Sequence, residues 1–198
     1  MFGADHPAGR LQDGGNRFRG HGIDDPLSAL GWEQMRQTAR AIDDWQRIIS
    51  SPMRRCLAFA EWLSQERGLA LTVEQDFREV GFGSWEGVSR SELQSQRREE
   101  YDAFYRDPVH NRPPGAEPLA AFGQRVGRAL TSLSAHYAGE RLLVVAHAGV
   151  IRAAVGHVMQ CPPAYWYQAD VANAGLTRFV HEGDAMRLVI HNWRPSPN

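Results

Sequence analysis

The chain has 198 residues, of which 42% are hydrophobic, so it is long enough to bury one well-packed core. Its 22 basic and 23 acidic residues give a formal net charge of −1 at pH 7. A nearly neutral molecule lacks the overall positive field that attracts nucleic acid or an anionic membrane. We therefore expect neither as a partner, and we expect any anion site to be local.

The two cysteines, Cys56 and Cys161, lie far apart in the sequence. The N-terminal stretch MFGADHPAG has no apolar segment of the kind that a secretory signal peptide contains. No apolar run approaches the roughly 20 residues that cross a bilayer. We therefore expect a cytoplasmic protein with reduced cysteines.

Helical and strand-like patterns alternate through the first part of the chain. Apolar residues at helical spacing, with Ser28 as a possible cap, predict a helix over Ser28–Trp45. A short strand over Arg47–Ser50 follows, then a helix over Pro52–Gly68 and a second strand over Leu69–Val73. This alternation is typical of α/β proteins.

A Gly-rich turn, GFGSWEG, follows Glu79 and leads into a polar stretch rich in Arg, Glu, Tyr and Phe. The pattern predicts a helical insertion over residues 88–114, which we expect to cover the face of the fold that carries the active site. Its aromatic residues Tyr101, Phe104 and Tyr105 could line a substrate pocket, but packing on the sheet is the commoner fate of such residues.

The last interpretable segments are a helix over Leu119–Tyr137, a continuously apolar strand over Arg141–Ala146 and a helix over Gly149–Met159. The tail after Met159 carries no motif. Together the segments predict one domain over residues 1–198, an α/β fold built as a three-layer α/β/α sandwich with a mostly parallel central sheet.

A lone histidine, His147, follows the apolar strand and precedes a helix. In open α/β sheets, ligands bind at the carboxyl ends of the strands, and a helix N-terminus offers free N–H groups to an anion. His147 is therefore a candidate anion ligand. The alternative, a histidine with satisfied hydrogen bonds in a strand-to-helix turn, is the commoner case for a single residue.

Two other strand ends carry charged residues. Arg54 and Arg55, in SSPMRRC, fall in the first turn of a predicted helix, where a cation opposes the helix dipole unless an anion lies between them. Arg54 reads as a solvated surface residue and Arg55 as a phosphate ligand. Glu79 could act as a general acid if its surroundings keep a proton available. The alternative for Glu79 is an ion pair with Arg78 or Arg54.

Five segments of the chain resemble, in the same order, successive sequence motifs of one protein family. The first, NRFRGHGIDDPLSALGWEQM, resembles the segment after that family's first catalytic motif. The family's next four motifs resemble SSPMRRC, FREVGFGSWEG, PPGAEPLAAFGQRV and LLVVAHAGVIRAA. Over residues 9–156 the chain thus resembles the histidine phosphatase superfamily, which has the phosphoglycerate mutase-like fold. Among its branches, the pattern resembles the small phosphatases, in particular α-ribazole phosphatase-like proteins.

The resemblance implies a role for each candidate residue. His147 corresponds to the second histidine of the phosphate pocket, Arg55 to the arginine that clamps phosphate, and Glu79 to the acid that protonates the leaving alkoxide. It implies a metal-independent phosphomonoesterase without a cofactor. Its ligand would be a small phosphorylated metabolite, such as α-ribazole phosphate, or inorganic phosphate.

The chain departs from the family at the first catalytic motif, Arg-His-Gly, whose histidine is the nucleophile. The expected glycine falls on Gly9, which places Pro7 and Ala8 at the arginine and histidine positions. Neither can attack phosphorus. His6 is a weak candidate for the missing imidazole, and His21, expected on a surface loop, is weaker still.

We also expect the family's first, central strand to be missing, because Met1–Gly9 contains two glycines and a proline, a composition that predicts coil. Unpaired neighbouring strands would lower stability. A shifted reading frame would explain both losses, since the bases that encode Asp5–Gly9, read one position later, permit Ile-Thr-Leu-Arg. Sequencing of the genomic locus tests this hypothesis.

Two functions remain open from the sequence. One is phosphomonoester hydrolysis through a phosphohistidine. The other is a catalytically inactive protein that binds phosphate or a partner. A different α/β hydrolase is a poor fit because the chain has no G-x-S-x-G motif. We expect a monomer or homodimer. Trp166 and Tyr167 could belong to an interface, but an ordinary core cluster is the commoner arrangement.

Overall fold

The structure, a computed structural model, describes residues 1–3, 17–42, 44–183 and 185–195. Its strands form one sheet in the order β3-β2-β4-β1-β5-β6, in which the first four are mutually parallel and the last two antiparallel. The strands are β1 (Phe2–Gly3), β2 (Arg47–Ser50), β3 (Ala70–Val73), β4 (Leu142–Ala146), β5 (Leu176–Glu182) and β6 (Ala185–Trp193).

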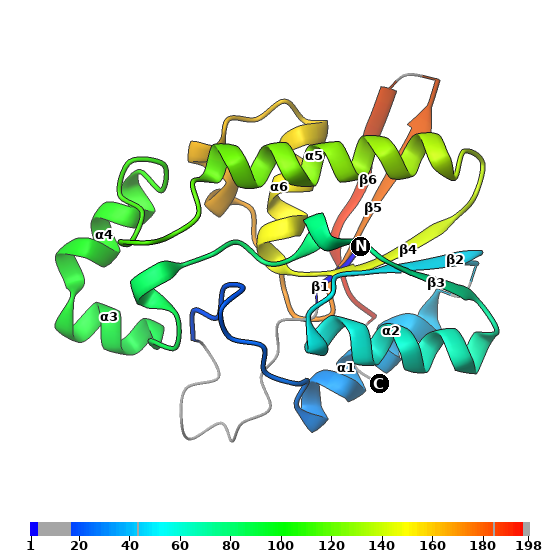
Figure 1. Cartoon of the computed structure of the whole chain (residues 1–198), viewed down its shortest axis with the longest axis horizontal. Helices are drawn as coiled ribbons and strands as arrows, with labels where there is room; N and C mark the ends of the chain where they lie inside the picture. Colours follow the sequence, from blue (N-terminus) through cyan, green and yellow to red (C-terminus); the bar gives the residue numbers. More distant parts are fainter. Residues whose placement is uncertain (4–16, 43, 184, 196–198) are drawn as a thin grey trace.

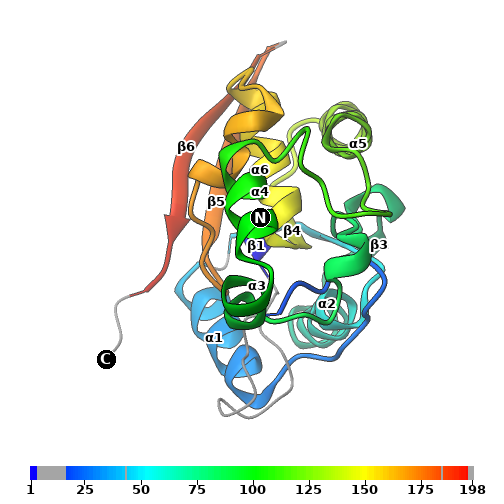
Figure 2. The same cartoon turned by 90° about the vertical axis from the view of Figure 1, so that its left-hand side faces the viewer.

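Helices cover both faces of the sheet. Figure 1 shows α1 and α2 on one side and α5 and α6 on the other, which confirms the three-layer architecture. In Figures 1 and 2, α3 and α4 lie at one end of the molecule. The helices are α1 (Ala29–Ala41), α2 (Arg54–Arg67), α3 (Arg90–Gln96), α4 (Arg98–Arg106), α5 (Leu119–His136) and α6 (Ala148–Val158), with short 3-10 turns η2 (Gln75–Phe77), η3 (Gly83–Trp85) and η4 (Pro163–Gln168).

The alternating side chains of β4 divide the core into two halves. Leu143 and Val145 belong to the cluster beneath α1 and α2, whereas Val144 and Ala146 belong to the cluster beneath α5 and α6. All four are buried, as expected for a parallel strand that is covered on both faces. The continuous apolar run in the sequence therefore has its physical cause in the two helical layers.

Helix ends follow the capping residues closely. The Ser28 hydroxyl accepts a hydrogen bond from the amide of Gly31 at 3.0 Å, and Gly68 ends α2 in the left-handed conformation with φ of 64°. The predicted helix Ser28–Trp45 is too long, because Ile42 adopts an extended backbone (φ −141°, ψ 121°) that stops α1 at Ala41. That early stop lets the chain turn into β2.

The expectation of coil at the N-terminus is wrong for Phe2 and Gly3. These residues form a short strand between β4 and β5. Phe2 pairs with Val145 of the parallel strand β4 and with Leu176 of the antiparallel strand β5. Backbone pairing to two neighbouring strands is the physical reason, since it stabilises a strand that local propensity does not favour. The central position is thus filled by a strand of two residues. Positions 4–16, including His6, Pro7, Ala8 and Gly9, lie outside the described residues.

The tail after Met159 forms the antiparallel hairpin of β5 and β6 at the edge of the sheet. Trp166 belongs to the core, with its ring centroid 6.3 Å from that of Phe122, and Tyr167 packs edge-on against Phe104 at 4.9 Å. The core interpretation of both aromatic residues is therefore confirmed. Within the described residues, none of the helices combines the length and apolar character needed to span a membrane.

Candidate active site

Strands β2 and β4 are neighbours, and the helices that follow them, α2 and α6, begin at the same end of the sheet. A cavity of about 180 Å³ lies there. Its lining includes Arg55 from α2, Glu79 from the loop after η2, Ala148 and Gly149 from α6, and Arg90 from α3. Residues that are far apart in the sequence thus meet at the carboxyl ends of the parallel strands, where open α/β sheets bind ligands.

Arg55 is almost completely buried, with 1% of its surface exposed. Its Nη1 donates to the carbonyl oxygen of Ile23 and its Nη2 to that of Gly20, both at 3.2 Å. These contacts fix the direction of the guanidinium group beside the cavity. Arg54, in contrast, is exposed, and its backbone amide donates to Asp24 Oδ1 at 2.8 Å. The adjacent arginines therefore have the different environments that the sequence suggested.

The Glu79 carboxylate lies against the N-terminus of α6. Its Oε1 accepts a hydrogen bond from the Val80 amide at 2.8 Å, and its Oε2 accepts one from the Gly149 amide at 3.2 Å. A Cβ atom at Gly149 would lie 2.2 Å from Glu79 Oε1, so only glycine permits this approach. The helix start therefore holds the carboxyl group at the wall of the cavity.

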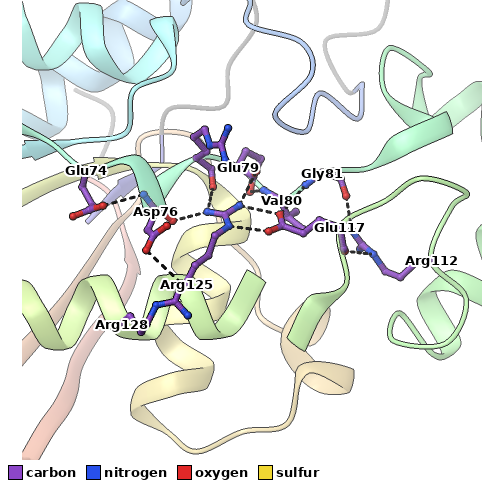
Figure 3. Close-up of polar contacts among 10 residues, drawn as sticks. Glu74, Asp76, Glu79, Val80, Gly81, Arg112, Glu117, Arg125 and Arg128 are labelled. Carbon is purple, nitrogen blue, oxygen red and sulfur yellow. Dashed lines mark hydrogen bonds and ion pairs between the residues drawn. The ribbon is translucent and has the colours of Figure 1, made fainter. Parts of the chain in front are cut away.

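Arg125 of α5 holds the loop that carries Glu79 (Figure 3). Its guanidinium group donates to the carbonyl oxygens of Asp76, Arg78 and Glu79, and it forms an ion pair with Glu117 at 2.8 Å. Burial raises the pKa of Glu117, but the hydrogen bonds and charge of Arg125 outweigh burial, so the net pKa lies below its usual value. The ion pair of Arg125 with Glu117 is therefore a charged brace that holds the loop in place.

Arg112 extends the brace on the other side of Glu117. Its Nη2 donates to the carbonyl oxygen of Gly81 at 2.6 Å, and its Nε donates to the carbonyl oxygen of Glu117 at 3.1 Å. The amide of Gly81 in turn donates to Glu117 Oε2 at 3.3 Å. Figure 3 shows Glu117 between the two arginines. The loop is therefore fixed through its backbone between Asp76 and Gly81, and two of its residues, Glu79 and Val80, line the cavity.

His147 is fully buried at the end of β4. Its Nε2 lies 2.7 Å from Ser51 Oγ and 3.4 Å from Cys56 Sγ. The ring does not belong to the described lining of the cavity, although Ala148 and Gly149, which follow it, do. The structure therefore brings Arg55 and Glu79 to one cavity and places the His147 ring in contact with Ser51 and Cys56.

The sequence interpretation missed several residues around the site. Ser51 and Cys56 lie within SSPMRRC, but only the arginines of that motif carried a recognisable charge signal. Arg90 and Arg152 line the cavity from α3 and α6. Arg90 lies outside the quoted motifs, and Arg152, although it lies within LLVVAHAGVIRAA, was given no role. His21, as expected, is exposed. Within the described ranges, no three His, Cys, Asp or Glu side chains gather in a way that could hold a metal ion.

Comparison with known proteins places the chain in a family. The sequence model of the histidine phosphatase superfamily (branch 1) matches residues 11–194. The adenosylcobalamin/alpha-ribazole phosphatase of Escherichia coli strain K12 is 28% identical over 145 residues, which cover 72% of this chain and 71% of that protein.

Solved structures agree. A mycobacterial glucosyl-3-phosphoglycerate phosphatase in complex with VO3 superposes with a TM-score of 0.80 at 26% identity, over 89% of this chain and 90% of that chain. The same phosphatase with inorganic phosphate gives a TM-score of 0.79 at 25% identity, over 90% and 92% of the two chains. The fold is phosphoglycerate mutase-like, and the chain belongs to the histidine phosphatase superfamily.

Proposed function

We propose that this protein binds a small phosphorylated metabolite in the cavity between Arg55 and Glu79, and that its reaction class is metal-independent phosphomonoester hydrolysis. One observation carries the proposal: Arg55 and Glu79, which are 24 positions apart, line one cavity with the first residues of α6. A guanidinium fork and the N-terminus of a helix both bind phosphate oxygens. The solved structures of one relative with VO3 and with inorganic phosphate support the same ligand class.

The reaction follows from the roles that the family implies. A histidine nitrogen attacks phosphorus and the ester P–O bond breaks, while Glu79 gives its proton to the departing alkoxide. Water then cleaves the phosphorus–nitrogen bond, which releases phosphate and restores the imidazole and the acid. Arg55 stabilises the charge on the transferring phosphoryl group. The resemblance implies the same role for His147, whose ring in this structure contacts Ser51 and Cys56.

The nucleophile separates two versions of this function. Ala8 occupies the position at which the family has its histidine, and an alanine cannot form the covalent intermediate. We therefore propose that the chain with Ala8 binds phosphate esters without turning them over, as a catalytically inactive member of its family. Hydrolysis needs the nucleophile, whereas binding needs only the remaining ligands.

Turnover of p-nitrophenyl phosphate in the presence of a chelator tests both versions, with vanadate binding measured in parallel by calorimetry. We expect the unchanged chain to bind vanadate without turnover. The double variant Pro7→Arg with Ala8→His, which creates an Arg-His-Gly sequence at positions 7–9, should gain turnover and form phosphohistidine. The double variant Pro7→Arg with Ala8→Asn is the matched control, because it adds the arginine without an imidazole.

Three results would contradict the proposal. Turnover by the unchanged chain that His6→Ala abolishes would show that His6 is the nucleophile. Turnover that only His147→Ala abolishes would overturn the mechanism. Absence of vanadate binding to the folded chain would show that the cavity is not a phosphate site.

A further inference from the structure

The cavity holds more positive charge than a phosphate ligand requires. Its lining contains five arginines and a single carboxylate, Glu79, and one of the five, Arg19, forms an ion pair with Asp25 at 3.3 Å. A phosphate monoester carries at most two negative charges, and Arg55 together with the α6 N-terminus already provides a phosphate position. The other arginines that line the cavity are Arg17, Arg19, Arg90 and Arg152.

Two of these arginines, Arg90 and Arg152, contact aromatic rings or a backbone carbonyl oxygen, which do not neutralise their positive charge. Arg152 donates through Nε to the carbonyl oxygen of Ala169 at 2.9 Å, and its guanidinium lies 5.5 Å from the ring centroid of Tyr167. Arg90 is exposed, and its guanidinium lies 5.7 Å from the ring centroid of Phe18 and 6.0 Å from that of Tyr105. Within the described part of the chain, neither arginine forms an ion pair with a carboxylate.

The two arginines line the same cavity of about 180 Å³, although they come from α3 and α6. The ring centroids of Tyr105 and Tyr167, which lie near them, are 6.2 Å apart. Burial raises the pKa of both tyrosines above its ordinary value. The phenols therefore stay neutral at physiological pH and do not cancel the arginine charges.

We propose that Arg90 and Arg152 form a second anion subsite, so that the preferred ligand is a phosphate monoester with a second anionic group. This inference rests on the proposed function, in which Arg55 binds the phosphoryl group. The second group is a carboxylate or a further phosphate, because a guanidinium fork matches both. The aromatic rings within 6.0 Å of each guanidinium favour a cation at these positions through cation–π attraction.

Calorimetry with two matched pairs of ligands tests the subsite on the full chain at constant ionic strength. In the first pair, 3-phosphoglycerate differs from glycerol 3-phosphate by a carboxylate. In the second, fructose 1,6-bisphosphate differs from fructose 6-phosphate by a phosphate. We expect the ligand with the second anion to bind at least about tenfold more tightly in one pair or both. The pair that shows the difference identifies the second group.

The double variant Arg90→Gln with Arg152→Gln should reduce that affinity ratio to about twofold or less. Arg187→Gln is the matched control, because it removes one positive charge from the exposed edge of the sheet, where Arg187 pairs with Glu182. It should keep the wild-type ratio. The ratio compares two ligands on the same protein, so a general loss of active protein does not alter it.

Each other outcome overturns a defined part of the inference. If inorganic phosphate binds but both ratios in the unchanged chain are near one, the subsite is wrong and the proposed function stands. If the ratio survives in the double variant, Arg90 and Arg152 do not form the subsite. If neither inorganic phosphate nor any of the four esters binds, the proposed function fails and the subsite fails with it.

Discussion

Two groups of arginines near the loop that carries Glu79 differ in their partners. Behind the loop, Arg125 is paired with the Glu117 carboxylate and donates to three backbone carbonyls. At the cavity, Arg152 and the exposed Arg90 lie near aromatic rings and have no carboxylate partner among the described residues. The comparison shows that a carboxylate partner distinguishes the structural cation from the two that are available to a ligand.

The largest effect on stability should come from Arg125→Met. This change leaves Glu117 without its ion pair and leaves the carbonyls of Asp76, Arg78 and Glu79 without their donor. We expect the free energy of unfolding in urea at neutral pH to fall by about 3–5 kcal/mol.

Arg128→Met is the control for that change, since Arg128 lies on the same helix as Arg125 but is exposed. Its Nη2 is 3.7 Å from Asp76 Oδ2. It should cost less than about 1 kcal/mol. Equal losses in Arg125→Met and Arg128→Met would show that the brace does not stabilise the loop.

The next effect concerns binding rather than folding. Arg55→Met should weaken binding of inorganic phosphate about 10- to 100-fold in calorimetry, because a charge-assisted hydrogen-bonding fork is lost. Arg54→Met, a change at the adjacent and exposed position, should alter the affinity by less than about twofold. If both variants bound equally well, Arg55 would not be the phosphate ligand.

The smallest effect is the pH dependence of the brace. The folded pKa of Glu117 lies below its ordinary value of 4.5, so the unfolded chain binds its proton first as pH falls. The stabilisation is therefore complete above that ordinary value and is lost as pH falls through the folded pKa. Glu117→Gln should lack this part of the acid slope in unfolding free energies, with Glu182→Gln, which removes an exposed carboxyl group, as the control. An unchanged slope in Glu117→Gln would argue against a charged brace.

The layered architecture could be predicted because it rests on local patterns. The buried run in β4 and the capping residues Ser28 and Gly68 each leave a signal within a few positions of the sequence. The hairpin of β5 and β6 left none that we could use, because an edge hairpin with exposed residues has no continuous apolar run. The pairing of Phe2 could not be predicted for another reason. Its partners, Val145 and Leu176, are more than 140 positions away in the sequence.

The site divides in the same way. Arg55 and Glu79 could be singled out, since each follows a strand within a recognisable motif. The contact of Ser51 with His147 and the neighbourhood of Arg90 and Arg152 depend on distances between elements that are far apart in the chain. Such distances arise from packing, and no local pattern records them. The roles of His147, Arg55 and Glu79 in the reaction remain predictions.

The hydrogen bond from the Gly149 amide to Glu79 Oε2 gives the site a built-in spectroscopic probe. The proton of that amide lies on the first turn of α6, so its chemical shift in an NMR spectrum depends directly on whether the carboxyl group is charged. Titration of this one resonance would therefore follow the ionisation of the acid residue without substrate and without turnover. Its rate of exchange with deuterated solvent would report how often the loop and the helix separate.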